Sequence, residues 1–167
     1  GRMMLCVGDK VAHPMHVAGV IDRIVTESVA GAVQDYYVFC MPMGGLVLKI
    51  PTSASAAIGL WNILDPIHAA KLLADLAALE VEKFTGSWNQ RYRDNMQKIK
   101  SGDLYQVAQV IKSLVNRDNE RGLSTGERKM LRTAKQILIS EIVLSTDETY
   151  QFIEDQVNAA MSGGIAV

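Results

Sequence analysis

Residues 36–51 read YYVFCMPMGGLVLKIP, two strand-length runs of β-branched, aromatic and aliphatic residues joined by a proline- and glycine-rich turn at 42–45. A similar run, VIDRIV, occupies residues 20–25, and turn signals at His13-Pro14 and Ala30-Gly31 separate the runs. Short strands with tight turns within about 50 residues predict a small β-barrel of the SH3 or Tudor kind. Because so small a barrel encloses little ligand, we expect a protein-interaction module here rather than an enzyme.

The hydrophobic period changes from strand-like to helical after residue 51. Residues 52–57 are small and are expected to begin a linker that extends to about residue 64. Asp65-Pro66 opens a helix that we expect to continue to about Phe84. Capping boxes at 87–90 and 124–127 open helices that run to about Lys100 and past Leu138, the second box being Ser124 with Glu127. A helix between them is predicted from Leu104 to Gly122, and Ser145 and Glu148 can cap a last helix that reaches Met161. The sequence therefore predicts an α+β protein with a Tudor- or SH3-like β-barrel at 1–57 and an all-α bundle of about five helices at 65–167.

Composition points to a globular protein with its own core. Of the 167 residues, 49% are hydrophobic and 21% are charged. The longest uncharged stretch, 50–64, is too short and too polar to span a bilayer. The first residues do not resemble a signal peptide, and Cys6 and Cys40 do not make a disulfide framework. We therefore expect a cytoplasmic protein.

The formal net charge of −1 is unevenly distributed along the chain. Residues 1–84 carry a net charge of −2, residues 85–135 carry +6, and residues 136–167 carry −5. A basic block of this kind suggests a polyanionic partner, although many helices carry solvated basic faces that bind nothing.

The sequence shows little sign of catalysis. It contains no GxGxxG, no Walker loop and no HExxH. The one group with the composition of a metal site is Cys6, His13, His16 and Cys40, but its spacing is unlike that of known zinc sites. We expect no metal, no cofactor and no enzymatic reaction.

The helix expected at 87–100 carries large apolar residues flanked by basic ones. The apolar stripe spans about 80° of the helix and consists of Trp88, Tyr92, Met96 and Ile99. Its flanks are Arg91 and Lys98 on one side and Arg93 and Lys100 on the other. The stripe fits a helix that packs Trp88 into a core, which is the commoner case. It also fits a Trp88 that projects from the first turn and wedges against unstacked bases while arginines hold phosphates. The basic run Arg128, Lys129, Arg132 and Lys135 likewise fits a solvent-exposed face.

Several motifs, in chain order, resemble the CarD/CdnL family of bacterial RNA-polymerase-binding transcription regulators. In the first part of the chain they are GDKV at 8–11, HPMH at 13–16, YYV at 36–38 and KIP at 49–51. The more specific ones are WNQRYR at 88–93, KIKSGD at 98–103 and RDNERGLSTGE at 117–127. The resemblance covers most of the chain from Val7 onward.

The resemblance implies a transcription regulator with two binding functions and no catalysis. A Tudor-like domain of the kind shared with a repair helicase would bind the polymerase β subunit, and the helical domain would contact promoter DNA. A tryptophan matching Trp88 enters the minor groove at the upstream edge of the transcription bubble, which favours the wedge over the core. The expected DNA-binding residues are Trp88, Arg91, Arg93, Lys98, Lys100, Arg128, Lys129 and Arg132.

The expected polymerase-binding strand is 46–50, namely Leu46, Val47, Leu48, Lys49 and Ile50. Alternation along a strand places Lys49 opposite to Leu48 and Ile50, away from the barrel core. If this strand lies at a sheet edge, its free backbone groups can extend a strand of the β subunit.

Three positions depart from the family pattern. Val17 stands where the family commonly has glycine, Gln90 where a basic residue is frequent, and Glu27 where some members have an arginine that contacts polymerase. The alternative function is that of a protein-interaction adaptor that binds polymerase or a related factor without touching DNA.

Overall fold

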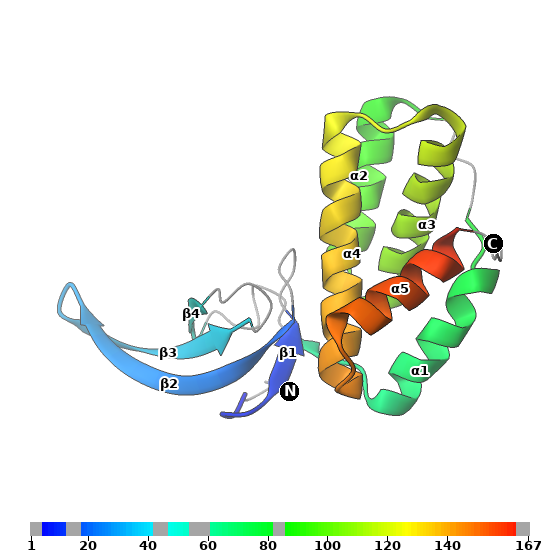
Figure 1. Ribbon diagram of the computed structural model, residues 1–167. Coiled ribbons are helices and arrows are strands. Elements are labelled where there is room, and N and C mark those ends of the chain that lie inside the picture. The colour runs from blue at the N-terminus through cyan, green and yellow to red at the C-terminus, as the bar shows by residue number, and fades with distance from the viewer. Residues whose placement is uncertain (1–4, 13–17, 42–46, 54–60, 82–85, 163–167) are drawn as a thin grey trace.

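The computed structural model describes residues 5–12, 18–41, 47–53, 61–81 and 86–162. Its strands are β1 (Lys10–Ala12), β2 (Gly19–Val29), β3 (Ala32–Cys40), β4 (Val47–Pro51) and β5 (Trp61–Asn62). Its helices are α1 (Pro66–Asp75) with the 3₁₀ turn η1 (Leu76–Ala78), α2 (Trp88–Ile99), α3 (Leu104–Arg121), α4 (Thr125–Thr146) and α5 (Tyr150–Met161). A curled sheet is followed by a bundle of helices (Figure 1), which confirms the α+β class with an N-terminal Tudor-like domain.

The strands form one antiparallel sheet in the order β4-β3-β2-β1-β5. Ile21, Phe39 and Ile50 are buried in its core. A Cβ on Gly19 would lie 2.4 Å from the carbonyl oxygen of Cys40, so only glycine allows β2 to approach β3 this closely.

Strand β5 lies within the stretch expected to be linker and pairs with β1. The chain after residue 57 therefore returns to the sheet before α1 begins. The division into domains at about residue 57 stays a prediction.

Most helix starts follow the predicted capping residues. The Asp65 side chain accepts a hydrogen bond from the His68 N–H at 2.8 Å, and Ser87 accepts one from the Gln90 N–H at 3.2 Å. At the start of α4, Ser124 and Glu127 form a reciprocal capping box.

Two helix boundaries differ from the prediction. The first helix ends at Asp75 and turns through η1 to Ala78, well before Phe84, which lies outside the described residues. The Lys112 Nζ of α3 donates to the carbonyl oxygens of Ala77 at 2.9 Å and Leu79 at 2.6 Å. A side chain from another helix thus satisfies carbonyl groups that the continuing helix would have bonded.

The last helix begins at Tyr150 behind Thr149, not behind Ser145 or Glu148. Helix α4 continues through Ser145 because its buried face continues through Ile142 and includes Ser145 itself. It stops where Asp147 adopts a left-handed conformation with φ of 58°.

Helix α4 is the central element of the structure. It packs against α1, α2, α3 and α5, and it also contacts β2. The helical core includes Leu72, Ile111, Leu138 and Ile153, all at most 1% exposed. None of the helices in the described ranges is long and apolar enough to cross a membrane.

Polar contacts join the C-terminal half of α4 to the sheet and to the segment that leaves it. The Ala18 N–H donates to Ser140 Oγ at 3.0 Å, and the Leu64 N–H donates to Glu141 Oε2 at 3.1 Å. Both side chains belong to residues that are only 1% exposed. Lys10 Nζ of β1 adds a hydrogen bond of 2.8 Å to the carbonyl oxygen of Leu144. Figure 1 shows β1 beside this half of α4.

The group considered as a metal site is only partly described. Cys6 is a free, exposed cysteine, contrary to the burial that its apolar neighbours suggest, and Cys40 is free and half-buried. His13 and His16 lie outside the described residues, as does the expected departure from the family pattern at Val17. Among the residues that the structure describes, no three His, Cys, Asp or Glu side chains are grouped so as to hold a metal.

The hydrogen bond between Ala18 and Ser140 yields a stability prediction. We expect Ser140→Ala to lower the free energy of unfolding by about 1–3 kcal/mol, because the buried Ala18 N–H loses its acceptor. Ser162→Ala is the matched control, since Ser162 Oγ also donates to a carbonyl three residues earlier but is exposed. Denaturant unfolding of both variants measures the difference, and equal losses would contradict a supporting role for Ser140.

Candidate nucleic-acid interface

The candidate interface lies where α2 and α4 begin and α3 ends. Gly122 stops α3 with a φ of 79°, a conformation that favours glycine, and Ser124 starts α4 two residues later. This connection lies at the top of the bundle in Figure 1. A Cβ on Gly126 would lie 3.8 Å from the Trp88 ring, so the first turns of α2 and α4 are in contact range.

Trp88 lies outside the core of the bundle. Its side chain is 46% exposed, and its ring stacks on that of Tyr92, one turn later in α2, with centroids 5.3 Å apart and planes 20° from parallel. Tyr92 is itself 37% exposed. The two rings therefore form an exposed aromatic pair at the end of the molecule, as the wedge interpretation expects.

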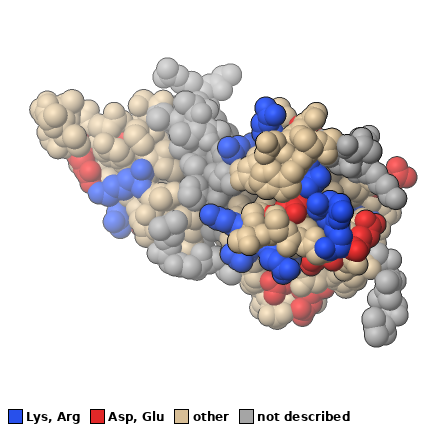
Figure 2. All heavy atoms as spheres, turned by 90° about the horizontal axis from the view of Figure 1, so that it is seen from above, with Lys and Arg blue, Asp and Glu red and all other residues tan. Residues whose placement is uncertain are grey.

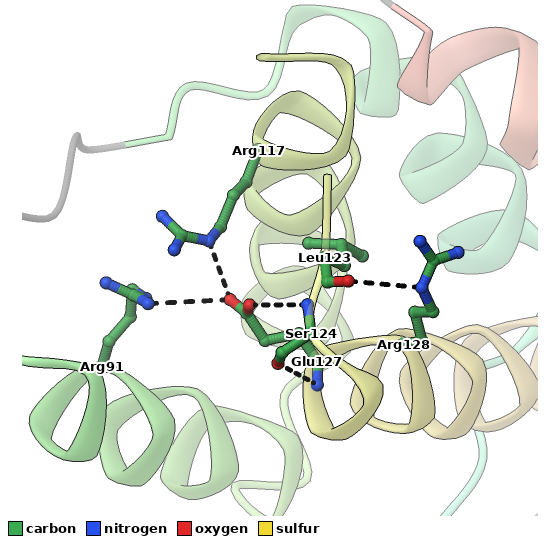
Figure 3. Close-up of polar contacts among 6 residues, drawn as sticks. All are labelled: Arg91, Arg117, Leu123, Ser124, Glu127 and Arg128. Atoms are coloured by element: carbon green, nitrogen blue, oxygen red, sulfur yellow. Dashed lines mark hydrogen bonds and ion pairs between the residues drawn. The ribbon is translucent and has the colours of Figure 1, made fainter. Parts of the chain in front are cut away.

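Glu127 is a buried acid next to this pair of rings. It is 5% exposed, and its Oε1 accepts a hydrogen bond from the Ser124 N–H at 3.2 Å (Figure 3). Its Oε2 lies 2.9 Å from Arg117 Nε, an ion pair without hydrogen-bond geometry, and 3.8 Å from Arg91 Nη2. Because the positive end of a helix dipole favours a carboxylate, the first turn of α4 also stabilises it. One side chain thus links α2, α3 and α4.

The predicted basic residues of α2 differ in their surroundings. Arg93 and Lys100 are exposed, and Lys98 is half-buried. The Arg91 side chain is only 17% exposed and faces Glu127. Arg91, Lys98 and Lys100 line a polar groove between α2 and α3.

The predicted basic residues of α4 are Arg128, Lys129 and Arg132, and all three are exposed. Arg128 lines a shallow groove together with Trp88. Arg132 lines a second groove, between α4 and α5, next to Tyr150, whose pKa is raised mainly by burial and also by the charge of Glu154. Figure 2 shows Lys and Arg side chains gathered over this end of the helical domain, with acidic side chains mainly along one border.

Sequence reasoning missed two arginines of this surface. Arg117 and Arg121 of α3 line the groove beside Trp88. Their spacing of four residues places them on one helix face, which was the available signal. Glu127 was expected only as a capping residue, because its ion pairs come from helices that are distant in sequence.

The strand expected to bind polymerase forms the edge of the described sheet, as β4. Ile50 is buried in the sheet core, with Leu48 packed against it. Val47 and Lys49 are exposed, and Lys49 forms an ion pair with Glu27 of β2. The predicted orientation of Lys49 is therefore confirmed, its role in binding stays a prediction, and Leu46 lies outside the described residues.

The exposure of Trp88 predicts a small effect of its removal on stability. We expect Trp88→Ala to lower the free energy of unfolding by about 1 kcal/mol, mostly through the lost ring stacking. Ile111→Ala, at a position that is fully buried in the same domain, should cost about 2–5 kcal/mol. Denaturant unfolding compares the two, and a similar large loss for Trp88→Ala would mean that the tryptophan supports the core.

Comparisons with known proteins match both parts of the chain. The CarD-like/TRCF RID domain matches residues 5–61, and the CarD C-terminal domain matches residues 71–158. The chain is 32% identical over 139 residues to the Bacillus subtilis (strain 168) protein named "Putative transcription factor YdeB". That match covers 83% of this chain and 90% of the relative. The chain belongs to the CarD/CdnL family of transcription regulators.

Proposed function

We propose that this CarD-like transcription regulator binds the β subunit of bacterial RNA polymerase through its sheet and promoter DNA through its helical domain. Trp88 enters the minor groove at the upstream edge of the transcription bubble and changes the lifetime of the open complex. The protein acts in the cytoplasm, at the nucleoid through polymerase, and catalyses no reaction. The single observation that carries the proposal is the exposed Trp88–Tyr92 pair at a basic end of the helical domain.

The DNA half of the proposal rests on the chemistry around Trp88. An exposed indole can insert at a base step that is already weakened at the bubble edge, where unstacking costs least. Arg93, Arg128 and Lys129 are exposed cations that can bind backbone phosphates on either side. The other proposed DNA-binding residues are Lys98, Lys100 and Arg132, whereas Arg91 faces Glu127.

The polymerase half rests on β4 and on the match to the CarD-like/TRCF RID domain. An edge strand offers backbone donors and acceptors that can extend a sheet of the partner. Val47 and Lys49 face outward from this strand and supply an apolar and a charged contact.

The two halves gain strength by acting together. Once the sheet is bound to polymerase, Trp88 meets promoter DNA at a high effective concentration, so weak DNA contacts suffice. The protein then stabilises whichever promoter intermediate accepts the wedge. Activation or repression follows from the step that limits initiation at a given promoter.

Open-complex lifetime separates this function from that of an adaptor without DNA contact. We expect Trp88→Ala to abolish the change in lifetime while retaining polymerase binding, because only the wedge is lost. Phe152→Ala is the matched control, since Phe152 is 48% exposed on α5 and Trp88 is 46% exposed. Competitor-challenge decay of open complexes gives the lifetimes. A folded Trp88→Ala protein that regulates like the wild type would support the adaptor instead.

Polymerase pull-down tests the β4 edge. We expect Lys49→Glu to weaken binding, because it reverses a charge on the proposed contact strand while leaving the buried Ile50 in place. Glu27→Gln breaks the same ion pair but leaves the lysine, so it should bind polymerase as well as the wild type. If the Glu27 variant binds as weakly as the Lys49 variant, the ion pair matters and not the lysine contact.

A further inference from the structure

Glu127 does more than cap α4, because one of its oxygens faces two arginines from other helices. Oε1 completes the capping box with Ser124. Oε2 lies within ion-pair distance of Arg117 on α3 and Arg91 on α2. A carboxylate that is 5% exposed needs such partners, since burying an unpaired charge is costly.

Glu127 also lies close to Trp88. Arg91 follows Trp88 by three residues and Tyr92 follows it by four, so both lie on the neighbouring turn of the same helix face. Gly126, which lies against the Trp88 ring, directly precedes Glu127. Trp88, Arg91, Tyr92 and Glu127 line one small cavity between α2 and α4. A contact that fixes Arg91 against α4 therefore fixes the turn that carries both rings.

We propose that Glu127 is a positioning residue that anchors the first turns of α2 through Arg91, so that Trp88 is held facing outward. Arg91 then serves this anchor and is not a phosphate contact of its own. The consequence for promoter DNA rests on the function proposed above, but the anchoring itself is a property of the free protein.

The sign of the effect of Glu127→Gln distinguishes the proposed anchor from a purely electrostatic role of this acid. Removing an acid from a DNA-binding surface adds net positive charge and should by itself strengthen the interaction with phosphates. Loss of the contact between Glu127 and Arg91 should instead weaken the effect of Trp88 on open-complex lifetime. The two explanations therefore predict changes of opposite sign for Glu127→Gln, a substitution that keeps the side-chain shape and an oxygen for the Ser124 N–H.

The test uses the full chain with Trp61→Phe, which leaves Trp88 as the single tryptophan. Acrylamide quenching of its fluorescence reports how accessible the ring is to solvent. We expect Glu127→Gln to raise the quenching constant toward twice its value, because the first turn of α2 would move away from α4 and expose the half of Trp88 that is now covered. The same variant should lose most of the effect on open-complex lifetime. Glu120→Gln removes the same charge from an exposed position on α3, and it should leave quenching unchanged and the effect equal or larger.

Arg91→Lys tests the same contact by changing its other partner. Lysine keeps the charge for a phosphate but loses the guanidinium that reaches Glu127. We expect Arg91→Lys to raise quenching as Glu127→Gln does, and the double variant to add little, because both changes remove one interaction.

Unchanged quenching in both single variants would overturn the proposal, and so would a Glu127→Gln protein with a strengthened effect on open complexes. If Trp88→Ala changes open-complex lifetime as much as the wild type does, the proposed function fails, and quenching alone decides the anchor.

Discussion

Helix α4 carries two buried carboxylates, and each of them contacts a different part of the chain. Glu127 in its first turn faces arginines of α2 and α3, and Glu141 accepts a hydrogen bond from the backbone N–H of Leu64, where the chain leaves the sheet. Fourteen residues of helix separate the two acids, a rise of about 21 Å. Since both residues are at most 5% exposed, neither carboxylate can give up its partners without a large loss of stability. Both parts of the chain therefore make polar contacts with this one helix.

The contacts of α4 with both parts of the chain suit the proposal of two separate binding surfaces. The edge strand β4 and the aromatic pair of α2 belong to different parts of the chain, yet both parts are fixed to α4. If polymerase holds the sheet, the position of Trp88 relative to the DNA is set by the fold and costs little further ordering. In the proposed function, such preorganisation would allow a single exposed indole and a few surface cations to act at a promoter. It also explains why the junction residues on α4 are polar but buried, since polar contacts fix one orientation where apolar packing alone tolerates several.

Local signals made much of the fold predictable, and long-range contacts account for the rest. The capping box at Ser124 depends on only four consecutive residues, so the start of its helix could be predicted from the sequence. The early end of α1 could not, because it involves Lys112 of another helix. The apolar stripe of α2 has the same periodicity whether Trp88 is buried in the core or exposed. Periodicity alone therefore favoured a buried Trp88, whereas the family resemblance favoured the exposed side chain that the structure has. Glu127 and Arg117 were recognised only as sequence motifs, because their ion pair depends on how α3 and α4 meet.

The central claim is that the first turn of α2 touches promoter DNA within the polymerase complex. A photocrosslinking amino acid in place of Asn89, which is exposed and adjacent to Trp88, tests this directly. Irradiation of complexes with polymerase and promoter should join this position to nucleotides at the upstream edge of the bubble, and the crosslink should be lost without polymerase. Crosslinks to polymerase alone, or to DNA far from that edge, would contradict the account.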